Sequence, residues 1–402
     1  MSETSNLPLR DLVVIDAATM LAGPWAATFL ADFGATVIKV EHPEKGDTVR
    51  NYGKKKDGKG VFWKTIGRNK RCVTLNLSTV EGQALFKKLV AKADVLIENY
   101  RPGTMEKWHI GWEDLHAVNP SLVMLRVTAF GQSGPYSKRA GFGTVAEAMS
   151  GFTSINGPKG GDPVLPGMPL ADGVCGYAGA LSIMIALHER ALNGEKKGQY
   201  IDVNLYEPLM RLLETHIVAY DQLGFVPGPM GNGSLTMAPR NAYKTSDGVW
   251  MALSGAAQPI AARVFQIIGQ PDLINDERFC DNAARMANVE ALDALISDWI
   301  GAHTMEEVQS AFEECGAAIG PMYTMRHLFE DPQYLHRGSF VTVEDDDFGP
   351  MRMPNVLCKF SRTPGKVITS GPAKSTHNVD IFCGLLGLSA QELEELKARG
   401  VV

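Results

Sequence analysis

The sequence lacks the cysteine and histidine patterns that mark metal and redox sites. Its 402 residues include six cysteines, widely scattered, and none forms a Cys-x-x-Cys pair. Such spacing argues against a zinc ribbon or a thioredoxin-like motif, and we interpret these residues as reduced, mostly buried thiols of a cytosolic protein. The nine histidines do not cluster at metal-ligand spacing either, so the sequence predicts no metal site.

Several catalytic and nucleotide-binding motifs are also missing. There is no Walker motif, no His-Glu-x-x-His and no Gly-x-Ser-x-Gly. The first predicted strand, at 12–16, continues into AATMLAGP at 17–24 and not into Gly-x-Gly-x-x-Gly. A dinucleotide fingerprint is therefore not supported.

Neither charge nor hydropathy marks a nucleic-acid or membrane protein. The chain has 45 acidic and 39 basic residues, a net charge of −6, which gives no strong footprint for nucleic acid or an anionic membrane. The first residues, MSETSNLPLRDL, contain no apolar core of a signal peptide, and the longest apolar stretch, 177–187, is shorter than a spanning helix needs. We expect a cytoplasmic protein with neither nucleic-acid nor membrane partners.

What is present is a regular alternation of strand-like and helix-like segments. Short apolar runs at 12–16, 36–40, 72–77, 94–98 and 122–128 are typical of strands that are covered on both faces. Helical patterns stand between them, for example at 24–33, where Pro24 lies in the first turn and Gly34 follows the last. This alternation predicts an α/β fold with a mostly parallel sheet. The Gly-, Pro- and Asn-rich stretch 224–241 indicates a loop or domain boundary.

The segment PLADGVCGY at 169–177 combines a carboxylate with glycines where a loop meets a helix expected from about 173 to 192. One interpretation is that Asp172 is an N-cap of this helix. The other is that Asp172 is a nucleophile: a carboxylate is ionised at pH 7 and needs no general base, and helical N–H groups could stabilise an oxyanion. The residues alone leave both open.

Polar and basic side chains follow the strand at 94–98, in IENYRPGTMEK at 97–107. Open α/β sheets place ligands at the carboxyl ends of their strands, so this stretch could hold phosphates and stack on a purine, or could be a solvated loop. The basic run RNKR at 68–71 could also hold a phosphate or form a solvated surface.

Taken together, these segments resemble the class III CoA-transferases of the CaiB/BaiF type, the family of the formyl-CoA:oxalate and carnitine CoA-transferases. No single motif is specific, but their order and spacing along the chain are. The similar stretches are AGP at 22–24, DFGATVIKVEHPEKGD at 32–47, GRNKRCVTLNL at 67–77, IENYRPG at 97–103, FGQSGPY at 130–136, PLAD at 169–172, GQYIDVNLYE at 198–207, TSDG at 245–248, GPMYTM at 320–325 and DPQ at 331–333.

The resemblance implies a two-domain chain in an interlocked homodimer. A Rossmann-like, parallel-sheet, CoA-binding large domain would be built from both chain ends, residues 1–225 and 331–402. Residues 226–330 would form a smaller α+β domain. These bounds follow from the likeness and from the composition of the 224–241 stretch.

The resemblance also implies an activity, the transfer of CoA from an acyl-CoA donor to a carboxylic-acid acceptor. Asp172 falls on the family's catalytic aspartate. It would form an aspartyl-acyl anhydride and then an aspartyl-CoA thioester, with coenzyme A as substrate and no permanently bound cofactor. The sequence leaves the donor and the acceptor acid open.

CoA contacts are implied at eight positions. Met20 and Leu21 fall at the family's pantetheine and thioester position, Asn99, Tyr100 and Lys107 at the nucleotide, and Leu75 at the adenine pocket. His42 falls where some members have a phosphate-binding arginine, and Arg139 lies near a family lysine. The glycine-rich loop of the oxalate enzyme is not reproduced in GPMGNGSLTMAP at 228–239, which disfavours oxalate as acceptor.

Two alternatives share this fold. An α-methylacyl-CoA racemase would pair the aspartate with a histidine, but Phe142 stands at that position and cannot exchange protons. A racemase would then need another base, with Glu147 a few positions on. A non-catalytic CoA-binding protein is disfavoured because Asp172 is kept in its glycine-rich setting.

Overall fold

The computed structural model describes residues 6–402, which form two compact units. The larger unit runs to Gly151, resumes over Pro166–Glu214 and takes in Leu335–Val402. The smaller unit consists of Phe152–Leu165 and Thr215–Tyr334. The smaller unit thus includes a segment that precedes Pro166. Its second segment begins at Thr215, before the 224–241 stretch that the sequence suggested as a boundary.

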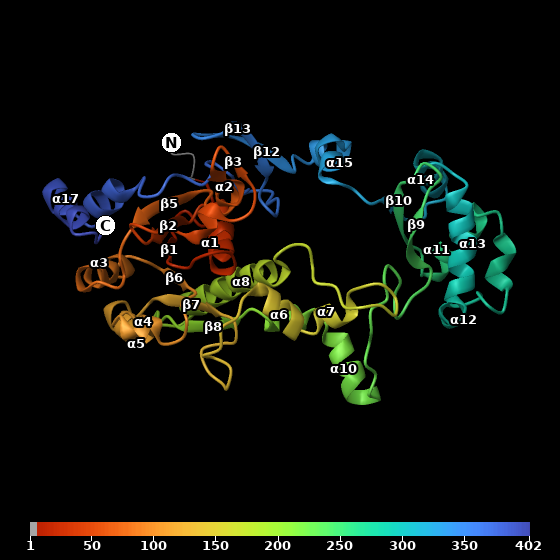
Figure 1. Ribbon diagram of the computed structural model, residues 1–402, viewed down its shortest axis with the longest axis horizontal. Helices are drawn as coiled ribbons and strands as arrows, with labels where there is room; N and C mark the ends of the chain where they lie inside the picture. Colours follow the sequence, from red (N-terminus) through yellow and green to blue (C-terminus); the bar gives the residue numbers. More distant parts are fainter. Residues whose placement is uncertain (1–5) are drawn as a thin grey trace. The chain divides into compact units, whose positions relative to one another are not determined.

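A six-stranded parallel sheet organises the larger unit (Figure 1). Its strands lie in the chain order 3-2-1-4-5-6, the doubly wound order of Rossmann-type sheets. The predicted α/β class with a parallel sheet is confirmed. Across the sheet the strands are β5 (Lys70–Thr74), β2 (Thr36–Glu41), β1 (Val13–Asp16), β6 (Val95–Glu98), β7 (Val123–Thr128) and β8 (Tyr200–Asn204).

Helices cover both faces of this sheet. Ile15, Leu96 and Met124 lie in one core cluster with residues of α3 (Val80–Val90), α5 (Trp112–Val118) and α17 (Ala390–Ala398). On the other face, α1 (Ala22–Asp32) and α8 (Leu170–Leu192) pack on the alternate residues, with Gly23 beside Ile97 and Gly179 beside Leu125. Burial on both faces explains why the strands read as nearly continuous apolar runs.

Helix α8 begins three residues earlier than the sequence suggested, so it includes Asp172. It is long and apolar enough to cross a membrane by length and composition, with 33% of its most apolar window buried. That is weak evidence for a span, because core helices pass the same test. After β8 the chain forms two short helices, α9 (Glu207–Arg211) and α10 (Glu214–Leu223).

The smaller unit has its own core, built from a sheet and helices. Its strands, in the order β11-β10-β9, are antiparallel, and Phe265, Phe279 and Phe312 are buried beneath them. Besides most of α10, its elements are α7 (Phe152–Ile155), β9 (Arg240–Lys244), β10 (Trp250–Ser254), α11 (Gln258–Ile267), η2 (Pro271–Asn275), α12 (Asn282–Ala287), α13 (Val289–Gly301), α14 (Met305–Glu314), β11 (Ile319–Pro321) and α15 (Met325–Glu330).

Shorter elements complete the chain. The hairpin of β12 (Phe340–Asp345) and β13 (Gly349–Pro354) is antiparallel. The other elements are η1 (Thr48–Asn51), β3 (Lys55–Lys56), β4 (Lys59–Gly60), α2 (Val61–Ile66), α4 (Thr104–Lys107), α6 (Gly143–Met149), α16 (Pro332–His336) and the π-helical η3 (Val379–Leu385).

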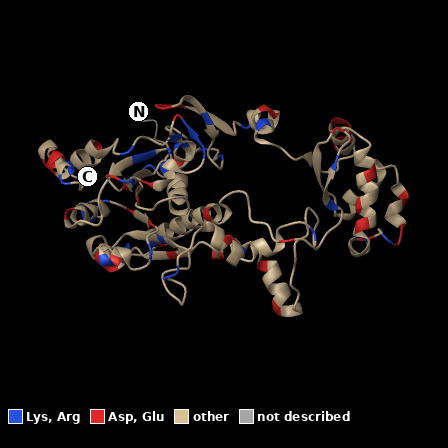
Figure 2. Cartoon of the chain, in the orientation of Figure 1, with Lys and Arg blue, Asp and Glu red and all other residues tan. Residues whose placement is uncertain are grey.

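Both units carry acidic and basic residues side by side (Figure 2).

Candidate functional site

The loops after β1 and β6 meet at the carboxyl edge of the sheet. β1 pairs with β2 on one side and β6 on the other, so the strand order reverses here. Such a switch point opens a crevice in which open α/β sheets bind ligands. Two predicted groups of site residues lie in these loops, Met20 with Leu21 and Asn99 with Tyr100.

Asn99 joins the two loops through its side-chain amide. Its Oδ1 accepts a hydrogen bond from the N–H of Thr19 at 2.8 Å, and its Nδ2 donates to the carbonyl of Thr19 at 2.7 Å. The amide therefore fixes the start of the β1–α1 loop. Both polar atoms of the Asn99 amide already have protein partners, so a nucleotide at this position would contact the rest of the Asn99 side chain.

A cavity of about 530 Å³ opens beside these loops, entirely within the larger unit. It is lined by four of the predicted site residues, Met20, Leu21, Asn99 and Asp172. Among the described residues that line it, the ionisable side chains are Asp172, Glu147 and Tyr52. Its wall is completed by Thr19, Ala22, Val127, Thr128, Ala129, Gly141, Phe142, Gly143, Thr144, Pro166, Gly167, Met168, Pro169 and Leu205.

Asp172 lies in the first turn of α8 and is not its N-cap. The cap position is Pro169, which makes no side-chain capping hydrogen bond. Of the two interpretations of Asp172 from sequence, the capping role is therefore wrong. The carboxylate stands near the positive end of the helix dipole, where a negative charge is favoured.

Close packing of α8 on α1 brings Asp172 to the start of α1. A Cβ on Gly176 would lie 2.9 Å from Cβ of Trp25 and 3.2 Å from the carbonyl oxygen of Ala22, so only glycine permits this approach. Gly176 is one turn after Asp172, and Ala22 is the first residue of α1. The amino ends of two helices thus meet at one cavity.

A second carboxylate, Glu147 of α6, lies behind Asp172. Glu147 is 4% exposed, and its Oε1 accepts a hydrogen bond from the N–H of Ala171 at 3.2 Å. Burial raises the pKa of Asp172 to about 6, and the charge of Glu147 contributes to the same rise. Asp172 is therefore mostly ionised at pH 7, but less well solvated than a surface carboxylate and correspondingly more reactive.

Phe142 lines the main cavity and directly precedes α6. Its side chain is 72% exposed and so does not fill the core, and Phe142 occupies the N-cap position of α6 without a side-chain hydrogen bond. A ring without ionisable atoms at this position offers Asp172 no opposed acid or base.

A smaller cavity, of about 130 Å³, adjoins the first. It is lined by two further predicted residues, Tyr100 and Arg139, and by Arg101. Tyr100 packs edge-on against Trp108, and the guanidinium of Arg139 lies 3.6 Å from the ring centre of Tyr136. The two cavities share a wall made of Asn99, Thr128, Ala129, Gly141 and Phe142.

Three predicted contacts lie outside both cavities. Leu75 is only 1% exposed and packs in the core with α3, so a ligand could meet only its main chain. His42 accepts hydrogen bonds at Nδ1 from the N–H groups of Glu44 and Lys45, and partial burial lowers its pKa, which favours the neutral ring. Lys107 is exposed at the end of α4.

The profile of the family described as CoA-transferase family III matches residues 9–378. The chain belongs to this family. It is an enzyme, a class III CoA-transferase, and it transfers CoA between acids.

Named relatives match this transferase along its whole length. It is 41% identical over 402 residues, all of both chains, to a succinyl-CoA–D-citramalate CoA-transferase of Chloroflexus aurantiacus. It is 32% identical to the human succinyl-CoA:glutarate CoA-transferase, with 100% of this chain and 91% of the relative covered. A crystal structure of a CaiB/BaiF family protein from Brucella suis superposes with a TM-score of 0.83 at 32% identity, covering 95% of this chain and 100% of that one.

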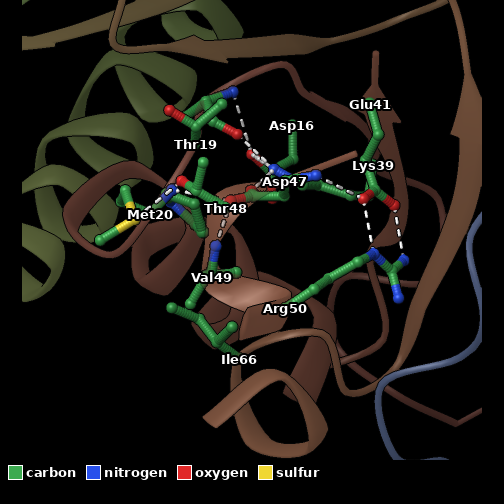
Figure 3. Close-up of polar contacts among 12 residues, drawn as sticks. Asp16, Thr19, Met20, Lys39, Glu41, Asp47, Thr48, Val49, Arg50 and Ile66 are labelled. Carbon is green, nitrogen blue, oxygen red and sulfur yellow. Dashed lines mark hydrogen bonds and ion pairs between the residues drawn. The ribbon is translucent and has the colours of Figure 1, made fainter. Parts of the chain in front are cut away.

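Sequence reasoning missed several residues of the transferase's site. Tyr52 and Gly143 line the main cavity. Asp47, which ends the DFGATVIKVEHPEKGD stretch, binds the N–H of Met20 through Oδ1 at 3.1 Å (Figure 3). No local pattern marks these positions, because each acquires its place from loops that only the fold brings together.

Proposed function

We propose that this enzyme transfers CoA between short dicarboxylic acids, with succinyl-CoA as donor and a second dicarboxylate as acceptor, through a covalent bond to Asp172. The observation that carries the mechanism is the position of Asp172: a half-buried carboxylate at the meeting point of two helix amino ends, inside a cavity large enough for an acyl group. The relatives named for succinyl-CoA support the donor.

The proposed chemistry balances without a general base. The Asp172 carboxylate attacks the thioester carbonyl, CoA leaves as thiolate, and an aspartyl-acyl anhydride forms. The thiolate then attacks the aspartyl carbonyl and expels the donor acid as its carboxylate. The acceptor carboxylate attacks the carbonyl of the resulting aspartyl-CoA thioester, CoA leaves again as thiolate, and an anhydride between Asp172 and the acceptor forms. The thiolate then attacks the acceptor carbonyl of this anhydride, which gives the CoA thioester of the acceptor and frees the Asp172 carboxylate. No step moves a proton, which agrees with a cavity whose described lining contains no histidine, lysine or cysteine.

Free N–H groups support the charged intermediates. Each attack places negative charge on a carbonyl oxygen, and preorganised N–H donors are the usual way to stabilise it. The first residues of α1 and α8 line the cavity, and neither N-cap residue, Leu21 or Pro169, makes a side-chain capping hydrogen bond; in α8 the N–H of Ala171 is taken by Glu147. The hydroxyl groups of Thr19, Tyr52 and Thr144 are the lining donors suited to the second carboxylate of a dicarboxylic acid.

The adjoining cavity supports a route for CoA. The thioester end would lie at Asp172, and the chain would pass the shared wall at Asn99 and Phe142. Beyond that wall, Arg101 and Arg139 offer cations suited to phosphate.

We also propose that the enzyme is an interlocked homodimer, as the family resemblance implies. Exposed apolar side chains on α8 support a covering surface from a second chain: Tyr177 is 47%, Leu181 63% and Ile185 61% exposed. Side chains of this kind on a single long helix are costly to leave in water.

A substrate panel tests the proposed function. Succinyl-CoA is incubated with citramalate of each hand, malate, glutarate and, as controls, acetate and propionate, and new CoA esters are identified by mass spectrometry. We expect esters of dicarboxylic acids and little or none of the monocarboxylic ones. Efficient transfer to the monocarboxylates alone would refute the proposed substrate class.

A further inference from the structure

The loop that links β1 to α1 is fastened at three consecutive residues by side chains from different parts of the sheet edge. Asp16 accepts from the N–H of Ala18 at 3.2 Å, and Lys39 donates to the carbonyl of Ala18. Asn99 binds both main-chain polar groups of Thr19, as described above. The N–H of the next residue, Met20, is held by Asp47 (Figure 3).

Met20 needs such a contact because its backbone is strained. Its φ is +65°, in the left-handed region, which costs a residue with a Cβ roughly 1 kcal/mol. Strain of this kind persists where surrounding contacts determine the conformation, and it clusters at functional sites. The hydroxyl group of Thr48 also contacts the sulfur of Met20 at 2.9 Å, and this weak contact helps to hold the Met20 side chain beside Thr48.

Asp47 is itself rigidly held. Its Oδ1 accepts from Val49 at 3.0 Å as well as from Met20, and its own N–H donates to Glu41 Oε2 at 2.9 Å. Its Oδ2 lies 2.8 Å from Nζ of Lys39, and both side chains are 1% exposed. Lys39 also lies 3.7 Å from Asp16.

The buried charges of Asp16, Lys39 and Asp47 cost desolvation free energy, so the cluster is a poor way to stabilise the fold. Burial disfavours the charged forms of Asp47 and Lys39, but their partners outweigh it. Lys39 and two main-chain hydrogen bonds lower the pKa of Asp47, and the charges of Asp16, Asp47 and Glu41 raise the pKa of Lys39. Replacing a buried ion pair by apolar groups is often neutral or stabilising, so such a pair is weak evidence of a stabilising role. A charged acceptor, however, makes a hydrogen bond about twice as strong as a neutral one.

The strained residue stands next to the reaction cavity. Met20, Leu21 and Ala22 line the cavity that contains Asp172, and α1 begins at Ala22. Any relaxation of the Met20 backbone would therefore move the first N–H groups of α1 relative to Asp172.

We propose that Asp47 is a positioning residue for CoA transfer: by holding the N–H of Met20, it keeps the start of α1 in register with the Asp172 carboxylate and the thioester carbonyl. The inference rests on the proposed function, because it serves the reaction at Asp172. Asp47 does not line the cavity, so it acts through Met20 and not on the substrate itself. Its effect belongs to the transition state, where a small displacement of donors is costly.

Kinetics of three variants test the inference. Asp47→Ala removes the acceptor, and we expect kcat to fall about 100-fold or more with KM for the acyl-CoA changed less than about threefold. Asp47→Asn retains an oxygen acceptor without the charge, and we expect partial rescue, a loss of about 5- to 20-fold. The matched control is Asp32→Asn, another buried aspartate, paired with Arg68 outside the cavity. It should lower the melting temperature while kcat stays within twofold.

The outcomes separate this inference from the proposed function. A folded Asp47→Ala variant with wild-type kcat overturns it, as does an equal loss of kcat in Asp32→Asn. If Asp47→Ala does not fold, Asp47→Asn decides: an unchanged kcat overturns the inference, and a selective loss of kcat supports it. If the wild-type enzyme transfers CoA to no acid, the proposed function fails, and crystal structures of the same variants decide the positioning role. If the φ angle of Met20 leaves the positive region in Asp47→Asn or Asp47→Ala, the positioning role is supported. If that angle stays near 65°, the positioning role is overturned.

Discussion

A Cβ on Gly143 would stand 2.2 Å from Oδ2 of Asp172, closer than any real Cβ contact, so the glycine defines where the carboxylate can lie. Gly143 is the first residue of α6, and its backbone φ is not in the left-handed region. The requirement for glycine is therefore one of space beside the carboxylate and not of backbone conformation.

This contact predicts that Gly143→Ala damages catalysis more than folding. The methyl group must displace Asp172, and a displacement of about 1 Å at a reacting group can cost on the order of 100-fold in rate. We expect kcat for CoA transfer to fall by about that factor in steady-state assays, with a small change in melting temperature. Gly384→Ala is the matched control, because a Cβ there meets nothing within 4 Å. Equal kcat in the two variants would contradict the prediction.

Asp172→Ala is expected to abolish transfer while CoA still binds. Covalent catalysis through one carboxylate loses nearly all activity when that group is removed, whereas the proposed CoA contacts at Arg101 and Arg139 remain. Isothermal titration with CoA and assays of transfer check both halves. Transfer by the variant at a rate near that of the wild type would exclude the aspartyl mechanism.

Asp172→Asn should also stabilise the enzyme, and only above acidic pH. The pKa of Asp172 rises from 3.8 in the unfolded chain to about 6 in the folded enzyme, so the folded state binds the proton more tightly. The cost of ionisation is absent below about pH 4, grows between pH 4 and 6, and is nearly complete at pH 7, where it is about 3 kcal/mol. Melting curves of variant and wild type should coincide near pH 4 and separate by a few degrees at pH 7. Equal separation at both pH values would disprove this linkage.

The rate of transfer should depend on pH through the same group. Because the nucleophile is the ionised carboxylate, kcat/KM is expected to rise with pH, with an apparent pKa near 6, and then level off. Glu147→Gln keeps an acceptor for the N–H of Ala171 but removes the neighbouring charge. It should shift the rising limb to lower pH, and a limb that does not move would show that Glu147 leaves the titration of Asp172 unaffected.

Isotope exchange should separate transfer from racemisation. Phe142 stands where a racemase would need a second acid or base, so a 2-methylacyl-CoA incubated in deuterium oxide should take up no deuterium at its α-carbon. Hydroxylamine added during turnover with the donor acyl-CoA should instead trap a hydroxamate at Asp172, detected by peptide mass spectrometry. Rapid α-deuteration without CoA exchange would favour the racemase, with Glu147 as the base.

Light scattering tests the proposed homodimer. Interlocked chains cannot separate without substantial unfolding, so the mass should remain that of two chains over a hundredfold dilution. The apolar side chains exposed on α8, among them Leu181 and Ile185, give the physical reason for a covered surface. A monomer that appears on dilution under native conditions would refute the interlocked arrangement.

The sequence by itself determined the class of fold and the nucleophile candidate. The apolar runs of β1, β2, β6 and β7 predicted a parallel sheet, because strands buried on both faces show continuous hydrophobicity. A carboxylate among glycines at a loop-to-helix junction singled out Asp172, and the order of motifs along the chain indicated the family. These are local features, and neighbouring residues suffice to reveal them.

Only the tertiary structure decided how these pieces act together. Asp172 proved to lie inside the first turn of α8, and the close packing at Gly176 brings this turn to the start of α1. Leu75, which the family resemblance assigned to the adenine pocket, turned its side chain into the core. The approach of Glu147 to Asp172, and of Asp47 to Met20, joins residues 25 and 27 positions apart in the chain. Contacts of this kind arise from the packing of whole helices and loops, and no periodicity in the sequence carries them.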